Sequence, residues 1–559
     1  MDDLDRARAC RGILPGRFGE GGGRLVTHDG TSILERDPVT FEVVRSALYA
    51  ICAEMKSVIM RTSFSPLLSL SADLSCALLD REGRVVAQGN DIPVHLGAAR
   101  FTADAIFRAF PVAQWKPRDA VITNDPYSGG THLPDVSMLT PVFGGDTLLG
   151  FALSRIHWPD VGGIARGSSS VSDEIIKEGL RIPPLKIVEE GRVREDALGL
   201  ILANVRAPSD REGDFRAAIA GHLRAEARLQ GLAEKYSAPA IVAIMGDTQA
   251  YSRSLVDARL RELPDTVVHH AEPLDGDGVD PDAAPVIRVA IEKRGTSLRF
   301  DFTGSDACVA GPVNAPIAVT SSAVFYTVLA FAGGDIAPNS GVYDNVEIVA
   351  PEGSVVNAAY PAPVVAANTE TANRLADILI AALGKSYPDR VSGGGYGSAC
   401  VYTLGGRDPR RDSPFVHYET IGGGMGATRD MDGASGLRVH MGNTMNLPVE
   451  ATEALVPVRF VDYALVRGSG GDGQRCGGLG VRKTLVALTG GIEASILGER
   501  TRSPAHGAAG GEPGACASFA IVGSDGTRRE LGAKSGPHRL AEGDRLEMVT
   551  AGGGGWGEA

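Results

Sequence analysis

The chain has 559 residues, 43% hydrophobic and 22% charged, which is enough to bury a large core without disulfide bonds. Its formal net charge of −13, with no block of Lys or Arg, argues against nucleic acid and against an anionic membrane surface as partners. The seven cysteines are scattered and form no CxxC pair, so a thiol-ligated zinc site is poorly supported and a reducing, cytoplasmic location is expected.

The N-terminal half begins with a charged, glycine-rich stretch, residues 1–36, which lacks the apolar core of a signal peptide and predicts a mobile lead-in. Apolar residues at helical spacing predict a helix over 37–60, and alternating residues predict a hairpin over 73–88. The next expected elements are a helix over 97–110 and buried strands over 120–123 and 147–156.

Two long helices are predicted over 196–236 and 238–261. The acidic, Pro- and Gly-rich stretch 272–285 follows them, and we place the main domain boundary there. The charge-free run 315–334 is long enough to cross a membrane, but Thr and Ser interrupt it and no basic flank orients it, so a buried helix is favoured. The other elements expected in this part are strands over 286–302 and helices over 317–331 and 369–383.

After Pro388 the sequence changes to glycine-rich runs, which predict short strands joined by glycine turns without a fixed repeat period. The expected fold class is therefore α+β and multi-domain, with a mixed N-terminal half and a glycine-rich, β-dominated C-terminal part. The expected regions are the lead-in 1–36, a mixed region with long helices over 37–271, an α/β region over 285–387 and the β-dominated region 388–559.

Two histidines in the segment 124–160 are each followed three residues later by an aspartate: His132 by Asp135, and His157 by Asp160. Imidazole nitrogen and carboxylate oxygen on a turn-rich, proline-stiffened backbone are suitable ligands for a divalent metal. The spacing does not place both histidines on one helical face, as HExxH does. Two structural histidines that cap loops therefore remain an equal alternative.

Further carboxylates and one imidazole are candidates to support such a site. Asp73 is either an additional ligand or an aspartate at the start of a strand. Asp91 and His95, in GNDIPVHLG, orient the substrate, support the metal ligands through hydrogen bonds, or form a satisfied structural pair. Asp125 and Asp160 are candidates to fix the tautomers of ligand imidazoles through hydrogen bonds.

The glycine-rich stretches do not predict a nucleotide site. The segments IGGGMGA (421–427) and GGDGQRCGGLG (470–480) lack the GxxxxGK[ST] spacing and its lysine. The sequence also contains no GxSxG motif, so it does not indicate a serine hydrolase. We therefore predict no cofactor-binding residues apart from the metal candidates.

A set of short motifs extends along nearly the whole chain: DIPVHLG (91–97), NDPYSGGTHLPD (124–135), RIHWPDVGG (155–163), EGLRIPP (178–184), NVRAP (204–208), FTGSD (302–306), GPVNAP (311–316), NTET (368–371), HYETIGGGMGA (417–427), NTMNLPVE (443–450) and GGDGQRCGGLGVRK (470–483). Each motif is weak alone, but together they are specific. On these motifs the chain resembles the hydantoinase B family, with the C-terminal half of 5-oxoprolinase and the alpha subunit of acetone carboxylase as relatives. The resemblance runs from about Asp37 to Gly557.

The resemblance implies an ATP-dependent enzyme made of two subunits. The partner, similar to hydantoinase A, would bind ATP and phosphorylate the oxygen of a lactam, imide or ketone. The chain described here would complete the reaction at a divalent metal, Zn, Mn or Fe. The residues that match the metal ligands of relatives are His132, Asp135 and His157, with Asp73 as the fourth candidate and Asp160 in support.

The favoured activity is hydrolysis of a small cyclic amide, because phosphorylation of its oxygen breaks amide resonance and lets a metal-activated water attack. Asp91, His95 or Asp125 would accept the proton. The chain is shorter than expected for an acetone carboxylase alpha subunit, which favours ring opening over the alternative, ketone carboxylation. A non-catalytic scaffold subunit is the alternative from another class.

Overall fold

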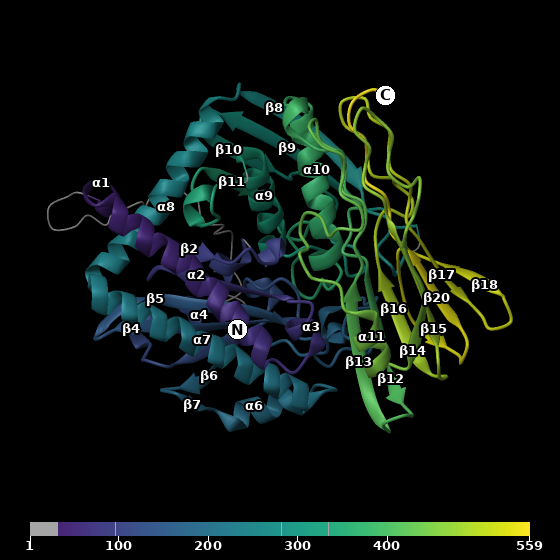
Figure 1. The fold of residues 1–559 in the computed structure, drawn as a ribbon, viewed down its shortest axis with the longest axis horizontal. Coiled ribbons are helices and arrows are strands. Elements are labelled where there is room, and N and C mark those ends of the chain that lie inside the picture. Colours follow the sequence, from purple (N-terminus) through teal and green to yellow (C-terminus); the bar gives the residue numbers. More distant parts are fainter. Residues whose placement is uncertain (1–31, 96, 281, 334) are drawn as a thin grey trace, which may run out of the picture.

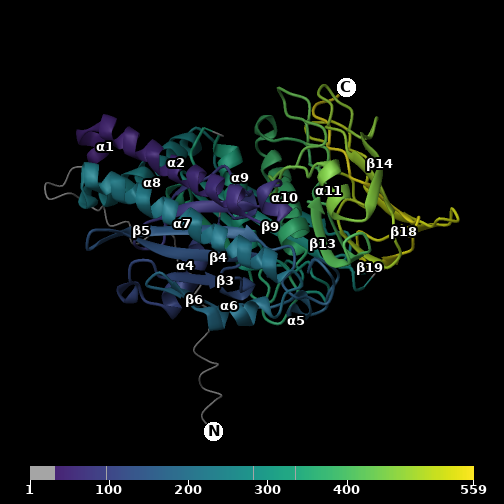
Figure 2. The same ribbon diagram turned by 60° about the horizontal axis from the view of Figure 1, so that its bottom comes forward.

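The computed structural model describes residues 32–95, 97–280, 282–333 and 335–559. The lead-in predicted for 1–36 lies outside these residues except for its last part, in which Ile33–Arg36 form helix α1. The long helices and the first sheet lie at one end of the molecule, and the glycine-rich strands lie at the other (Figure 1, Figure 2). The predicted α+β, multi-domain fold with a β-dominated C-terminal part is thereby confirmed.

The first sheet is covered by helices on both faces. Its order is β2-β1-β5-β4-β3-β6-β7. Because successive strand residues point to opposite faces, Cys76 and Leu78 join the core with α2, α7 and α8, whereas Ala77 and Leu79 join the core with α4. The helices are α2 (Pro38–Thr62), α4 (Ala98–Ala109), α7 (Pro208–Tyr236) and α8 (Ala238–Arg261). The strands are β1 (Leu74–Leu79), β2 (Val85–Gln88), β3 (Ala120–Thr123), β4 (Asp135–Gly144), β5 (Thr147–His157), β6 (Leu185–Glu189) and β7 (Arg192–Val193).

A second sheet has the order β11-β10-β9-β8. Its strands are β8 (Thr266–Pro273), β9 (Val286–Arg294), β10 (Ser297–Asp301) and β11 (Val346–Val349). The acidic stretch 272–285, where composition places the domain boundary, connects β8 to β9, and these two strands pair antiparallel. The acidic segment is therefore the long connection of a hairpin, and β8 belongs to the same sheet as the strands that follow it.

Two helices fill the centre of the molecule, α9 (Ile317–Ala332) and α10 (Ala372–Gly384). Helix α9 is the buried helix that the charge-free run predicts, since nearly all of its side chains are enclosed by protein. In the part of the chain that the structure describes, no helix combines the length and apolar character needed to cross a bilayer. The short helices are α3 (Pro66–Ser69), α5 (Ile175–Glu178), α6 (Glu195–Leu202) and α11 (Val449–Leu455).

Two further sheets enclose the core of the C-terminal part. One has the order β13-β12-β16-β19 and the other β14-β15-β20-β17-β18. Apolar side chains from both sheets form one cluster, which includes Tyr402, Ile496, Leu485 and Phe519. The strands are β12 (Val401–Asp408), β13 (Ser413–Thr420), β14 (Val458–Leu465), β15 (Val481–Ala487), β16 (Ile492–Leu497), β17 (Ser518–Val522), β18 (Arg528–Leu531), β19 (Lys534–Leu540) and β20 (Arg545–Val549).

The glycine-rich loops at the top of these sheets lie back to back. A Cβ atom added at Gly424 would stand 2.0 Å from the carbonyl oxygen of Gly478, and one at Gly553 would stand 2.1 Å from that of Met425. Such distances exclude any side chain, because another backbone occupies the space. Close backbone packing, rather than a phosphate-binding loop, therefore accounts for the glycine runs.

Buried charges join α10 to the C-terminal sheets. Arg374 on α10 pairs with Glu272 of β8 at 2.9 Å and with Glu499, just after β16, at 2.9 Å. One turn later on α10, Asp377 pairs with Arg500 at 2.7 Å. A charge that loses its partner inside a protein is strongly destabilising, so these pairs fix the two regions relative to each other.

The Glu272 carboxylate makes this junction pH-dependent. Burial opposes its ionisation, but the hydrogen bond from His270 and the charges of Arg500 and Arg374 outweigh burial and lower the pKa of Glu272 from 4.5 to about 2. The ionised carboxylate therefore stabilises the folded state fully above about pH 4.5, and this contribution is lost as the pH falls towards 2.

We expect Glu272→Gln to lower the free energy of unfolding at pH 7 by about 2–3 kcal/mol, as measured by urea unfolding. The difference from the wild type should shrink as the pH falls below about 4.5. Glu347→Gln is the matched control, since its Arg299 pair is exposed and should contribute at most about 1 kcal/mol. A difference that stays constant between neutral and acidic pH would contradict this account.

Candidate metal centre

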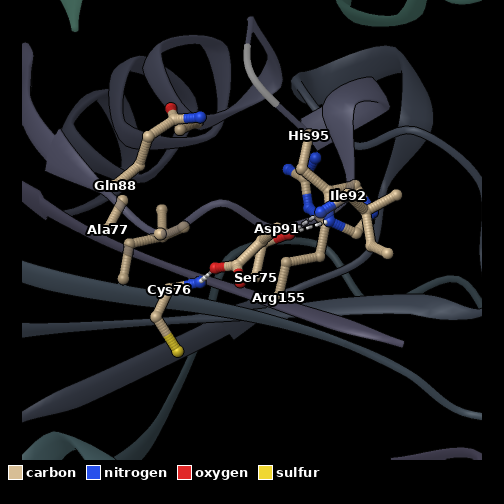
Figure 3. A pocket seen from close by; sticks show the side chains of 11 residues that line it. Ser75, Cys76, Ala77, Gln88, Asp91, Ile92, His95 and Arg155 are labelled. Atoms are coloured by element: carbon tan, nitrogen blue, oxygen red, sulfur yellow. Dashed lines mark hydrogen bonds between the residues drawn. The ribbon is translucent and has the colours of Figure 1, made fainter. Parts of the chain in front are cut away.

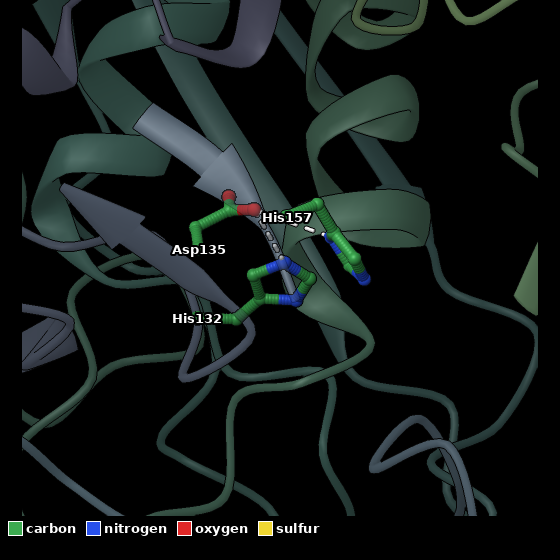
Figure 4. Close-up of side chains that lie close together, drawn as sticks. All are labelled: His132, Asp135 and His157. Carbon is green, nitrogen blue, oxygen red and sulfur yellow. Dashed lines mark hydrogen bonds and ion pairs between the residues drawn. The ribbon is translucent and has the colours of Figure 1, made fainter. Parts of the chain in front are cut away.

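Three predicted ligands meet at one end of the central hairpin of the first sheet. Asp135 is the first residue of β4 and His157 the last of β5, and the strand register pairs them directly. His132 lies in the tight loop before β4, where the Asp135 amide donates to the His132 carbonyl oxygen at 3.1 Å. The hairpin register and this loop therefore point the three side chains at one another (Figure 4).

The cluster is compact and shielded from solvent. The Asp135 Oδ1 atom lies 3.2 Å from His132 Nε2 and 3.2 Å from His157 Nδ1. One ligand atom from each of the three residues lies within 4.8 Å of the others, and all three residues are at most 2% exposed. Two nitrogens and one carboxylate oxygen form a donor set suited to a divalent metal such as zinc, manganese or iron.

The charges of the cluster support each other. Burial opposes ionisation of Asp135, but His132 and His95 outweigh burial and hold its pKa well below the usual value. Burial also acts to lower the pKa of His132, yet the charge of Asp135 and the hydrogen bond to it raise that pKa overall. A buried, ionised carboxylate facing imidazole nitrogens is an environment that binds cations.

Two buried polar atoms beside the cluster have no hydrogen-bond partner among the described residues: His157 Nε2 and Asn368 Oδ1. Buried polar atoms nearly always have a partner, so atoms of this kind indicate a place for a ligand. Together with the donor set, they make the residues present a good fit for a metal and a bound polar group.

The tautomer of His132 is set from a distant part of the chain. Its Nδ1 atom lies 3.3 Å from the Val365 carbonyl oxygen, which can only accept, so Nδ1 carries a proton and Nε2 is the nitrogen that would bind a metal. The Val365 amide in turn donates to Glu178 Oε1 at 3.0 Å, and the Val364 amide does so at 2.8 Å. Glu178, in the EGLRIPP motif, therefore holds the backbone that orients His132.

The structure brings His95 to the site. Its Nε2 atom lies 3.1 Å from Asp135 Oδ2, and its Nδ1 atom lies 2.7 Å from Ser75 Oγ. Burial lowers the pKa of His95, which favours the neutral ring. Asp73 lies beside the cluster, with Oδ2 3.9 Å from His157 Nδ1, and burial raises the pKa of its carboxyl group.

The other three predicted carboxylates have different partners. Asp91 pairs with Lys56 at 2.7 Å and accepts from the Cys76 amide at 2.9 Å (Figure 3). Asp125 caps a short helical turn by accepting from the Tyr127 amide. Within the described residues, neither carboxylate contacts His132 or His157, so their assignment as proton acceptors gains no support from these contacts.

Asp160 also differs from its expected supporting role. Its carboxylate accepts from the amides of Gly162 and Gly167 and pairs with Arg206 at 2.7 Å. These bonds fix the glycine loop after β5 rather than an imidazole ring.

Asn368 is a site residue that sequence reasoning does not identify. Its Nδ2 atom lies 3.2 Å from His132 Nε2 and 3.3 Å from Asp135 Oδ2. It belongs to a π-helical turn, Ala367–Thr371, which precedes α10 and widens the helix at this point. The sequence signal at this position is the NTET motif (368–371), which contributes to the family resemblance. No local pattern within it indicates a function for Asn368.

Fold and site together define an α+β protein with a buried His–Asp–His cluster that could hold a metal ion. Residues 37–559 match the family described as Hydantoinase B/oxoprolinase. The chain belongs to this family, which confirms the resemblance drawn from its motifs.

Two sequence relatives and a solved structure show what this chain is similar to. The 5-oxoprolinase of Dictyostelium discoideum is 31% identical over 539 residues, which are 94% of this chain but only 41% of that protein's length. Caprolactamase subunit beta of Pseudomonas jessenii is 31% identical over 489 residues, 85% of this chain and 82% of the subunit. The crystal structure of the ATP-dependent caprolactamase from that organism matches with a TM-score of 0.86 at 28% identity, covering 93% of this chain and 91% of the matched chain.

Acetone carboxylase has a similar fold. Its nucleotide-free structure matches with a TM-score of 0.85, covering 94% of this chain and 76% of the matched chain. The identity is 18%, so this likeness establishes a shared fold and nothing about the reaction.

We expect the purified chain to hold a divalent metal, and His132→Ala and His157→Ala each to lose most of it, as measured by elemental analysis. His222→Ala is the control, because His222 is equally buried but bonds only to the hydroxyls of Thr140 and Ser154. Metal content that is equal in all four proteins would remove the cluster from consideration.

Glu178→Ala should weaken metal affinity by about 10- to 100-fold, since it frees the backbone that orients His132. Ser172→Ala is the control, because Ser172 donates to the same Glu178 oxygen without touching that backbone. Competition with a chelator at pH 7 measures the affinity. Equal affinities for Glu178→Ala and the wild type would show that the backbone is held without Glu178.

Proposed function

We propose that this chain is the metal-dependent subunit of an ATP-dependent amidohydrolase. It would open a lactam or cyclic imide that a hydantoinase A-like partner subunit has phosphorylated. The observation that carries the proposal is the buried His132–Asp135–His157 cluster in a chain whose sequence has no phosphate-binding lysine loop. The related 5-oxoprolinase and caprolactamase, named for cyclic amides, supply the substrate class.

The ligand residues would hold the metal, which when bound supplies an electrophile and lowers the pKa of water. Asp135 provides the negative charge of the site, and its other oxygen is held by His95 and by Thr131, at 2.5 Å. These bonds keep the carboxylate from turning away from the histidines. Such orientation by surrounding groups is what lets a metal site keep its geometry while substrate binds.

The chemistry needs proton transfer as well as a metal. Water adds to the activated ring carbon, the carbon–nitrogen bond breaks as nitrogen takes a proton, and the acyl phosphate left behind is hydrolysed. We assign this proton transfer to Asp73 and His95, because both line the pocket beside His157. Burial raises the pKa of Asp73 above that of an ordinary carboxyl group, which makes its carboxylate a stronger proton acceptor.

The test combines the chain with its ATP-binding partner and assays ATP hydrolysis and ring opening with hydantoin, 5-oxoproline and caprolactam. We expect the chain alone to turn over no ATP and the complex to open at least one ring. In the complex, His132→Ala should abolish ring opening, whereas His222→Ala should leave it unchanged. ATP turnover by the isolated chain, or full ring opening by His132→Ala, would contradict the proposal.

A further inference from the structure

One arginine faces the pocket above the metal cluster. The pocket is lined by Asp73, His157, Asn368, Tyr418, Arg438 and Thr444, among others. Arg438 is the only arginine or lysine among the described residues that line it. A single cation placed beside ligands for a metal is a feature that metal binding itself does not require.

Arg438 lies in a loop, residues 436–446, which runs between β13 and α11 and contacts segments that flank the first sheet; we call it the crossing loop. The Met445 amide donates to the Ser71 carbonyl oxygen at 2.8 Å, and the Asn443 amide side chain donates to the Asn90 carbonyl oxygen at 3.2 Å. His440 pairs with Asp377 at 2.8 Å. The crossing loop is therefore fastened to three parts of the molecule, so Arg438 has a fixed position.

The guanidinium is held only by neutral oxygens. Its Nε donates to Thr420 Oγ1 at 2.7 Å, its Nη1 donates to Asn446 Oδ1 at 2.6 Å, and its Nη2 donates to the Thr420 carbonyl oxygen. No carboxylate forms an ion pair with Arg438 within the described ranges. Of the five N–H groups of a guanidinium, these bonds use three. The charge is thus fixed in place but not neutralised.

Other donors share this pocket with Arg438. The Tyr418 ring lies against the His157 ring, tilted by 37° with the centroids 4.4 Å apart, and its hydroxyl makes no hydrogen bond within the described residues. The hydroxyl is a neutral donor. Among the described residues that line the pocket, Asp73 is the one carboxylate, and it lies on the His157 side.

We propose that Arg438 and the Tyr418 hydroxyl form an oxyanion subsite that binds a phosphoryl or carboxylate group of the activated cyclic amide. This inference rests on the proposed function and adds a requirement to it: the substrate reaches the metal as an anion. A guanidinium with free N–H groups matches the oxygen geometry of either group. The two groups differ in how widely they occur. Every phosphorylated substrate carries a phosphoryl group, whereas only some ring substrates carry a carboxylate.

The first experiment measures anion binding without turnover. Inorganic phosphate and acetate are titrated by calorimetry into the metal-loaded chain, wild type and Arg438→Gln. We expect Arg438→Gln to weaken anion binding by about 10- to 100-fold, the loss that follows from removing a charged hydrogen-bond donor. Arg81→Gln is the matched control, because Arg81 is also half-buried and donates to a backbone carbonyl, that of Leu148.

Asn446→Asp is a second variant, which tests the subsite without removing Arg438 and so without the folding defect that Arg438→Gln could cause. It keeps the acceptor for Arg438 Nη1 but places a carboxylate at that position, so an internal anion competes with the added one. Asn446 is exposed, and the substitution changes little in shape. We expect anion affinity at least about tenfold below the wild type, with unchanged metal content and thermal midpoint. If Arg438→Gln and Asn446→Asp both bind anions with wild-type affinity, the subsite is overturned. The same holds if the wild-type chain binds neither anion at millimolar concentration.

The second experiment separates the two sources of the anion in the complex with the ATP-binding partner. If Arg438 binds the phosphoryl group, Asn446→Asp lowers kcat/KM for 5-oxoproline and for caprolactam alike. If it binds a substrate carboxylate, the KM rises for 5-oxoproline only. Unchanged constants for both substrates would overturn the subsite while leaving ring opening intact. A wild-type complex that opens no ring would refute the proposed function, whatever the result of the calorimetry.

Discussion

The buried carboxylate of Asp135 is the constraint around which the site is built. It is 1% exposed, and an ionised carboxylate at such a depth is tolerated only where donors and cations surround it. Its neighbours come from separate elements: the loop before β4, the end of β5, the turn that carries His95, and the π-helical turn before α10. Each of these elements must be in its folded position for the charge of Asp135 to be compensated. The site is therefore complete only when much of the molecule has folded.

Rigidity at this centre comes from hydrogen bonds that act through intermediates. Glu178 fixes the Val365 backbone, which fixes the tautomer of His132. The crossing loop similarly fixes Arg438 over the pocket, because its bonds reach the first sheet and α10. The β-dominated part, which carries none of the three metal-ligand candidates, thus contributes a wall of the pocket.

Sequence reasoning succeeded where structure depends on local pattern. Helical spacing located α2, a charge-free apolar run located α9, and the three ligand candidates were found because they lie on one loop and one hairpin. It could not find Asn368 or Glu178, whose partners are far away in the chain and whose surroundings show no periodicity. Residue type also misleads: Asp91 and Asp160 are acids in the right motifs, but the fold gives each a cationic partner elsewhere. Composition likewise cannot distinguish the β8–β9 connection from a linker between domains.

The stacked glycine loops of the C-terminal part affect how variation in this family should be interpreted. Gly424, Gly478 and Gly553 touch neighbouring backbones, and no side chain can replace their hydrogens without moving another strand of chain. Mutational scanning would find these positions as intolerant as catalytic ones, although they bear no functional group. Intolerance to substitution in the glycine runs is therefore a measure of backbone packing, and it should not be taken to mark a second active site.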